Sequence, residues 1–282
     1  MIITKGVEQK MIDIHTHILP NIDDGSRSID ETFNLIKEAQ EAGFDKVVLT
    51  SHYMEGYYET DSKERDVWLN AIYQNLGIKN INVELYLGNE IYMSENLIKL
   101  LEDGKASTIN DTSYVLFEMP LNAEPLNLYD IIYQMQQCKV VPILAHPERY
   151  EFIKNDSELI YDLIKKGVLM QANYGSIIGQ YGEKTKIMVT KLLENNMIHM
   201  LGTDVHRQKT IYQKIPECLE KIEQIVGKEK LEILTTTNPN LVLNNKIIDI
   251  EEPIEIEYTF KDKFDFMTGG KLKKIFGRFI TK

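Results

Sequence analysis

The sequence predicts an α/β protein folded as one distorted, TIM-like (β/α)7 barrel, and three observations lead to this class. Seven short β-rich runs alternate with longer amphipathic stretches, a pattern typical of parallel strands joined by crossover helices. Six of the seven runs end in His, Asp or Glu. A closed barrel brings all its strand ends to one face, whereas an open sheet gathers its site at one switch point. The length of 282 residues fits a single barrel domain.

The predicted strands are, in order, residues 11–18, 46–52, 82–90, 113–118, 140–146, 168–173 and 198–204. Helices are expected between them at residues 29–42, 61–76, 95–101, 126–137, 157–166 and 184–195, and after the last strand at 212–226 and 228–236. In the first helix Phe33, Ile36 and Ala39 recur at helical spacing, and Gly43 ends it. We expect the glycine-rich stretch 175–182 to form a mobile loop at the rim rather than a phosphate cradle.

Composition excludes several classes of protein. A content of 43% hydrophobic and 27% charged residues is that of an ordinary globular domain, and a net charge of −11 argues against a protein that coats nucleic acid. No apolar run approaches the roughly 18 residues that span a bilayer, and residues 1–10 show no secretion signal. Two cysteines cannot form a disulfide framework, so we expect a reducing, cytoplasmic setting.

The polar residues at the strand ends predict a multinuclear metal centre. They are His15, His17, His52, Glu90, Glu118, His146, Asp204 and His206, and the loop after the first strand adds Asp23 and Asp24. Side chains two apart on a strand share a face, so His15 and His17 can bind one ion. Imidazoles combined with carboxylates suit Mn, Fe or Zn. His199 has a different parity from Asp204, and we expect it to be a structural histidine.

Such a centre suits phosphate chemistry. Two or three cations can hold a phosphate and lower the pKa of a bridging water. Arg149, after His146, is well placed to bind phosphate in bidentate fashion. Arg207 and Lys209 are candidates for the same role or are exposed cations at a helix start.

Other phosphatase and nucleotide-binding mechanisms lack their motifs. A cysteine phosphatase needs an arginine six residues after its thiolate, where Cys138 and Cys218 have Leu144 and Gln224. The sequence also contains no P-loop motif and no Gly-x-Ser-x-Gly motif.

At these residues the chain resembles the PHP (polymerase and histidinol phosphatase) family, and more narrowly the CpsB/YwqE-type protein-tyrosine phosphatases of bacterial capsule and exopolysaccharide systems. The matching segments, which keep their order and spacing across residues 11–245, are residues 11–20, 23–25, 50–52, 88–90, 117–118, 145–150 and 203–206. His-x-His alone is a weak signal, but the ordered set is specific.

The resemblance implies a barrel of the PHP type with up to three metal ions, usually manganese. Carried over residue by residue, the implied ligands are His15, His17, Asp24, His52, Glu90, Glu118, His146, Asp204 and His206. Glu90 is the candidate for a bridging carboxylate, and Arg149 would hold the phosphate. The implied reaction is hydrolysis by a metal-activated water, without a cysteine nucleophile. The implied substrate is the phosphotyrosine tail of a membrane-associated tyrosine kinase that controls polysaccharide polymerisation.

One position departs from the family pattern. The capsule enzymes carry a second functional arginine five residues after the last histidine ligand, where this chain has Ile211. Either Arg207 or Lys209 replaces it, or the second phosphate contact is missing. Two rival hypotheses stay open: a PHP phosphomonoesterase for a small molecule such as histidinol phosphate, and a non-catalytic protein that docks on the kinase. Against the docking protein, every implied ligand is present, whereas a non-catalytic relative would be expected to have lost at least one.

The two ends of the chain flank the predicted barrel domain at residues 11–248. Residues 1–10 form an N-terminal extension. The tail, 249–282, contains seven Lys/Arg and two Asp from residue 261 onward. In segment 271–282, apolar residues recur at helical offsets between lysines, which predicts a basic amphipathic helix. It would contact the inner membrane surface, or dock on the acidic body or on another subunit.

Overall fold

The computed structural model describes residues 10–259 together with 262, 264, 266 and 268. The strands are β1 (Met11–Thr16), β2 (Phe44–Leu49), β3 (His52–Tyr53), β4 (Glu84–Leu87), β5 (Glu90–Tyr92), β6 (Tyr114–Glu118), β7 (Val141–Ala145), β8 (Leu169–Asn173) and β9 (Met200–Gly202). Their pairings are parallel, in the orders β1-β2-β4 and β3-β5-β6-β7-β8-β9.

The two strand groups form one closed barrel. After a short break, β2 continues into β3, and β4 continues into β5 in the same way. At the other edge β9 meets β1, because Asp204 N donates to His15 O at 2.9 Å and His17 N donates to Val205 O at 3.0 Å. The predicted seven-stranded barrel is therefore confirmed, with the second and third predicted strands each divided in two.

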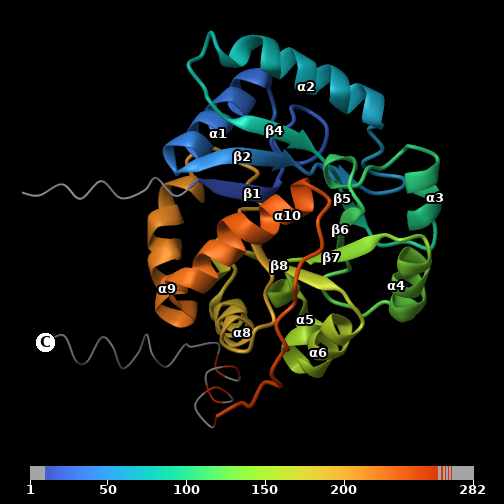
Figure 1. Cartoon of the computed structure of the whole chain (residues 1–282), viewed down its shortest axis with the longest axis vertical. Helices are drawn as coiled ribbons and strands as arrows, with labels where there is room; N and C mark the ends of the chain where they lie inside the picture. Colours follow the sequence, from blue (N-terminus) through green and yellow to red (C-terminus); the bar gives the residue numbers. More distant parts are fainter. Residues whose placement is uncertain (1–9, 260–261, 263, 265, 267, 269–282) are drawn as a thin grey trace, which may run out of the picture.

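Helices cover the outside of the barrel and one of its ends (Figure 1). They are α1 (Ile29–Glu41), α2 (Ser62–Leu76), α3 (Leu97–Glu102), α4 (Leu128–Gln137), α5 (Glu151–Asn155), α6 (Glu158–Lys165), α7 (Tyr174–Ile177), α8 (Glu183–Glu194), α9 (Ile215–Glu232) and α10 (Asn238–Leu243), with the short turns η1 (Ile109–Asp111), η2 (Pro147–Arg149), η3 (Tyr212–Lys214) and η4 (Ile233–Thr237). The break predicted between the last two helices is Gly227, which has a φ of 79° inside α9.

The start of the glycine-rich stretch is not the mobile loop that we expected. Residues Tyr174–Ile177 form α7, and all four are buried. The ring of Tyr174 lies edge-on to that of Phe44 at 5.9 Å, and Ile177 is part of the same core. Burial of these two large apolar side chains outweighs the flexibility that the glycines would otherwise confer.

Two apolar cores leave one mouth of the barrel polar. The larger core lies between strands and helices, and the smaller one fills the barrel interior with residues such as Ile12, Ile14 and Ile143. Val242 and Leu243 of α10 belong to the interior core, and Figure 1 shows α10 lying across the strands. This helix closes the mouth at the amino-terminal strand ends. The polar strand ends therefore gather at the opposite mouth, where barrel enzymes place their sites.

The chain after α10 runs down past α5, α6 and α8 (Figure 1). Glu252 pairs with Lys165 of α6, and Glu251 pairs with Lys230 of α9 at 2.9 Å. No helix in the described part of the chain is long and apolar enough to cross a membrane. The predicted amphipathic segment 271–282 and the extension up to residue 9 lie outside the described residues.

Candidate metal centre

The fold brings all nine predicted ligands to one mouth of the barrel. Their donor atoms form overlapping groups in which each atom lies within 4.8 Å of the others. These groups are His17, Asp24, His52 and His206; His15, His17, Glu90 and Asp204; and His52, Glu90 and Glu118. His146 joins them through Nε2, which lies 2.8 Å from Glu90 Oε1. Residues from six strand ends and one loop thus converge.

Glu90 lies at the centre of the convergence. Its Oε2 is 3.2 Å from Nε2 of His15, 3.3 Å from Nε2 of His17 and 3.0 Å from Nδ1 of His52. The side chain is fully buried, and Oε2 has no hydrogen-bond partner within the described residues. A buried carboxylate oxygen facing three imidazoles is what a bridging metal ligand requires, and it is otherwise costly to leave unsatisfied.

The rings of His15 and His17 are held with Nε2 facing inward. Nδ1 of His15 lies 2.6 Å from Gln171 Oε1, and Nδ1 of His17 lies 2.8 Å from Asp23 Oδ2. Because both oxygens can only accept, each Nδ1 carries a proton, which leaves Nε2 as the nitrogen that can offer a lone pair to an ion. The two Nε2 atoms are 3.1 Å apart. Lone pairs at this separation need a cation or a proton between them, so the donor set fits a metal ion.

Asp24, rather than Asp23, faces the cluster. Asp24 Oδ1 lies 3.2 Å from Nε2 of His206, whose Nδ1 lies 2.9 Å from the carbonyl oxygen of Asp204. Asp23 instead stands behind the ligands, where it also accepts from His52 N at 2.9 Å and from Gly25 N. The first carboxylate orients the loop, and the second is free to bind an ion.

The electrostatics keep the carboxylates charged. Burial alone would raise the pKa of Glu90, but the charges of His15 and His52 lower that pKa well below its usual value. The pKa of Asp204 is also lowered well below its usual value, because the charge of His15 and the contact with His17 outweigh the effect of burial. Conversely, burial would lower the pKa of His15, but Glu90 and Asp204 raise it. Metal binding must therefore displace protons from imidazoles beside ionised carboxylates.

Two of the candidate ligands have an uncommon backbone conformation. His146 has a φ of 36° directly after β7, and Asp204 has a φ of 53° two residues after the end of β9. A left-handed conformation costs a residue other than glycine about 1–2 kcal/mol. Such strain persists where the surrounding structure imposes it, and it concentrates at functional sites. Here it turns both side chains toward the same mouth.

Arg149 lies at the edge of the cluster. Its Nη1 donates to Asp204 Oδ2 at 2.8 Å, and its guanidinium lies 4.6 Å from the ring centroid of Tyr181. A cavity of about 270 Å³ opens beside it, lined by Tyr181, Arg207 and Ile211 among others. Arg207 donates to the backbone oxygens of Gly25 and His206. Lys209 is exposed, and its backbone N–H bonds Glu38.

Comparison with known proteins agrees with this geometry. Residues 11–244 match the family described as "Capsular polysaccharide synthesis, CpsB/CapC". The chain belongs to the CpsB/CapC family. The CapC protein of Staphylococcus aureus is 30% identical over 95% of this chain and 99% of its own length. The tyrosine-protein phosphatase YwqE of Bacillus subtilis is 30% identical over 86% of this chain and 95% of its own length.

Solved structures support the same assignment. A chain described under "Crystal structures of YwqE from Bacillus subtilis and CpsB from Streptococcus pneumoniae, unique metal-dependent tyrosine phosphatases" matches with a TM-score of 0.83 and 30% identity, over 88% of this chain and all of that one. A histidinol phosphate phosphatase from Lactococcus lactis, at 14% identity and a TM-score of 0.50 over 80% of this chain and 98% of that one, shares the fold alone.

Sequence reasoning missed the contribution of the sixth predicted strand, now β8, to this CpsB/CapC site. Besides the contact of Gln171 with His15, Asn173 Nδ2 donates to Asp204 Oδ2 at 2.8 Å. Asp13 was missed too: it accepts from Thr203 N at 2.9 Å and so holds the residue before Asp204. The available signal was that Gln171 and Asn173 stand two apart at a strand end, like His15 and His17.

The remaining histidine and the cysteines lie away from the cluster. His199 is buried, as expected, and its Nδ1 accepts from Met170 N at 2.9 Å. Cys218 is buried in α9, and burial raises the pKa of its thiol to about 12. Cys138 lies at the exposed end of α4. Neither thiol is among the residues grouped at the barrel mouth.

Proposed function

We propose that this protein is a metal-dependent protein-tyrosine phosphatase that acts on the phosphotyrosine tail of a bacterial tyrosine kinase controlling capsule or exopolysaccharide synthesis. The observation that carries the proposal is the convergence of nine imidazole and carboxylate side chains at one mouth, with Arg149 at its edge. The relatives named as tyrosine-protein phosphatases support the substrate class.

The nine predicted ligands would hold up to three divalent ions, with manganese first and Fe or Zn as alternatives. Three overlapping donor groups, which share His17, His52 and Glu90, support this number. When bound, such ions neutralise phosphate charge and lower the pKa of a bound water toward neutrality. The mixed imidazole and carboxylate donors suit manganese, iron and zinc better than the all-oxygen sets of magnesium and calcium.

Arg149 would bind and orient the phosphate. Its guanidinium is held between Asp204 and the ring of Tyr181, so its orientation is set before a substrate arrives. A planar guanidinium can donate two parallel hydrogen bonds to a phosphate. Arg207 would then hold the Gly25 loop against His206, and it lines the same cavity as Arg149.

The cavity beside Arg149 favours an aryl phosphate. Beside its polar and charged lining residues, the wall includes the aromatic ring of Tyr181 and the aliphatic side chains of Val205 and Ile211. Ile211, which stands where the capsule enzymes have an arginine, leaves this part of the wall apolar. A phenyl ring gains from contact with such a surface, whereas a polar histidinol chain does not.

We place the enzyme in the cytoplasm, near the inner membrane face where such a kinase would lie.

A Mn²⁺-supplemented assay tests the proposal with three substrates: a phosphotyrosine peptide, histidinol phosphate and 4-nitrophenyl phosphate. We expect turnover of both aryl phosphates, loss of turnover after chelation, and recovery when Mn²⁺ returns. His15→Ala should lose both activity and metal binding because it removes a central ligand. Activity confined to histidinol phosphate would contradict the substrate. Kinase binding without turnover of any substrate would favour the docking protein.

A further inference from the structure

Two interruptions in the barrel strands place His52 and Glu90 side by side. β2 breaks at Thr50 and Ser51, and β4 breaks at Gly88 and Asn89. Beyond the breaks, His52 pairs in register with Glu90 between β3 and β5. The position of the central carboxylate therefore depends on how the chain passes through the second break.

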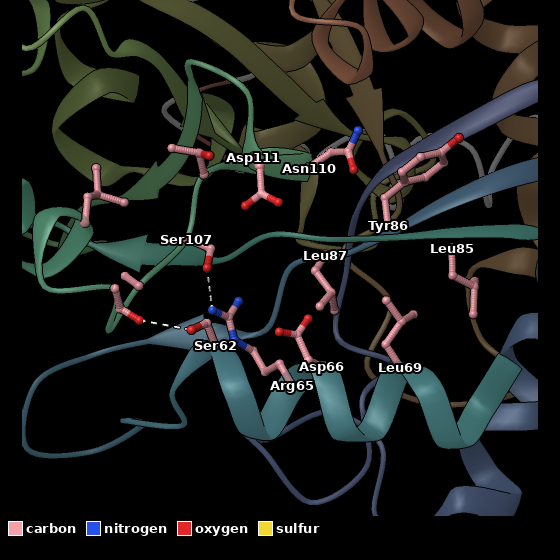
Figure 2. Close-up of a pocket in the computed structure, with 14 residues that line it drawn as sticks. Ser62, Arg65, Asp66, Leu69, Leu85, Tyr86, Leu87, Ser107, Asn110 and Asp111 are labelled. Carbon is pink, nitrogen blue, oxygen red and sulfur yellow. Dashed lines mark hydrogen bonds between the residues drawn. The ribbon is translucent and has the colours of Figure 1, made fainter.

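A buried arginine holds this second break. Arg65 of α2 is fully buried, and its Nη1 donates to the carbonyl oxygen of Gly88 at 2.8 Å. Its Nη2 donates to Ser107 Oγ at 2.7 Å, and Figure 2 shows the side chain reaching from the helix toward Ser107. Among the described residues, no carboxylate lies within 4.0 Å of the guanidinium as an ion-pair partner.

Asn89 and Ser107 connect this second break to the first break, at Thr50 and Ser51. Asn89 Nδ2 donates to the carbonyl oxygen of Ser51 at 2.8 Å, and its Oδ1 accepts from Ser107 N at 2.9 Å. We call Arg65, Asn89 and Ser107 the strand-break clamp. Together they tie α2, both strand breaks and the loop before η1 into one network.

We propose that Arg65 is a positioning residue for the metal centre, which sets the path of Gly88 so that Glu90, two residues later, meets the imidazoles of His15, His17 and His52. Burying a cation whose hydrogen-bond partners are all neutral is costly, even with the carboxylates of Asp66, Asp61 and Asp111 nearby, and an apolar residue would serve packing better. What the guanidinium adds is a rigid fork that holds two acceptors at a fixed angle, which lysine cannot do. The inference rests on the proposed metal centre and not on the proposed substrate.

Gly88 itself has close neighbours, which makes the path of the chain at this residue definite. A Cβ on Gly88 would lie 3.3 Å from Cα of Ile109 and 3.5 Å from Cγ2 of Thr50. The chain therefore passes close to both η1 and the first break, and a Cβ would fit only if Ile109 moved slightly. A small change in the Gly88 carbonyl direction would be passed to Glu90 rather than absorbed locally.

The test measures Mn²⁺ binding by calorimetry on the purified, full-length, metal-free protein. Arg65→Lys keeps the charge but loses the fork, and we expect its Mn²⁺ affinity to fall by about 10–100-fold, as happens when groups behind metal ligands are removed. Ser107→Ala keeps the contact between Arg65 and Gly88, so its Mn²⁺ affinity should fall less than that of Arg65→Lys. Tyr86→Phe, which removes a hydroxyl from the same pocket without touching the clamp, should bind Mn²⁺ like the wild type (Figure 2).

A second control separates positioning from stability. Ile72→Val loosens the packing of the same helix α2 without touching the clamp, so it should lower the thermal midpoint yet retain Mn²⁺ affinity. A folded Arg65→Lys protein with wild-type Mn²⁺ affinity would overturn the proposal. If Arg65→Lys does not fold, Ser107→Ala decides, and unchanged affinity there refutes the clamp. A wild type that binds Mn²⁺ without hydrolysing phosphotyrosine would defeat the proposed function alone.

Discussion

The amide oxygen of Gln171 lies 2.6 Å from Nδ1 of His15, and both side chains are fully buried. The contact spans 156 residues of sequence and joins β8 to β1. It fixes which nitrogen of His15 carries the proton, so that Nε2 faces Glu90 and Asp204. The strand without a ligand of its own therefore controls a ligand from another strand.

Gln171→Met should weaken metal binding without unfolding the protein. The thioether has nearly the volume of the amide but cannot accept the Nδ1 proton, so the His15 ring can rotate or change tautomer. We expect Mn²⁺ affinity to fall by about 10–100-fold in calorimetry. Gln171→Glu retains an acceptor and should restore most of the affinity. Equal binding by the wild type and Gln171→Met would show that the contact has no such role.

Gly202→Ala should disturb the same pair through steric contact. A Cβ at Gly202 would lie 2.7 Å from Cβ of His15 and 2.9 Å from Nε2 of Gln171. We expect a marked loss of Mn²⁺ binding together with a lower thermal midpoint. Gly77→Ala is the matched control, because a Cβ there meets nothing within 4 Å and its φ is −63°. A Gly202→Ala protein that binds Mn²⁺ normally would count against the packing described at the centre.

The two arginines near the cavity should fail in different ways. Arg149→Met removes a phosphate donor, so we expect kcat/KM to fall by about 100-fold or more. Mn²⁺ affinity should fall less than this, because Asp204 loses its contact with Arg149 but keeps the one with Asn173. Arg207→Met releases the Gly25 and His206 carbonyls, which hold the loop beside the metal ligands. We therefore expect weaker Mn²⁺ binding, and a loss of turnover that is reduced when Mn²⁺ is in excess. Calorimetry and steady-state kinetics on both variants distinguish the roles. Identical effects of the two changes would contradict this assignment.

His199 should make the metal-free protein less stable in acid. Burial, followed by the charge of Lys230, lowers the pKa of His199 to about 3 from the usual 6.5. Because the folded pKa is the lower one, the unfolded state takes up a proton first, and stability falls as pH drops below 6.5. The loss approaches about 1.4 kcal/mol per pH unit, or roughly 2 kcal/mol at pH 5.

Urea unfolding at pH 7 and pH 5 measures this effect by difference. His199→Asn keeps an acceptor for Met170 N but cannot be protonated, so it should lose less stability than the wild type between the two pH values. The other histidines are present in both proteins and cancel to first order. Equal pH dependence would show that His199 does not titrate in this way.

Much of the fold and of the candidate site could be predicted from the sequence because their signals are local. Alternation and helical spacing mark each strand and helix within a few residues, so the seven runs and their order were confirmed. The breaks at Thr50 and Gly88 were not predicted, because the β pattern continues through them and only the pairing partners change. For α7, the glycines indicated a loop, but the burial of Tyr174 and Ile177 decided the structure.

By itself, the sequence determined the barrel class and the placement of His, Asp and Glu at the strand ends, and it named Arg149 as a candidate for binding phosphate, because residue type and strand position suffice for these. Only the tertiary structure decided how those groups are held: Gln171 behind His15, Asp23 behind His17 and Arg65 behind Gly88. The physical reason is that amides, hydroxyls and guanidinium groups have many possible partners along a chain. Their role is set by distances between segments that are far apart in sequence, which folding alone brings together.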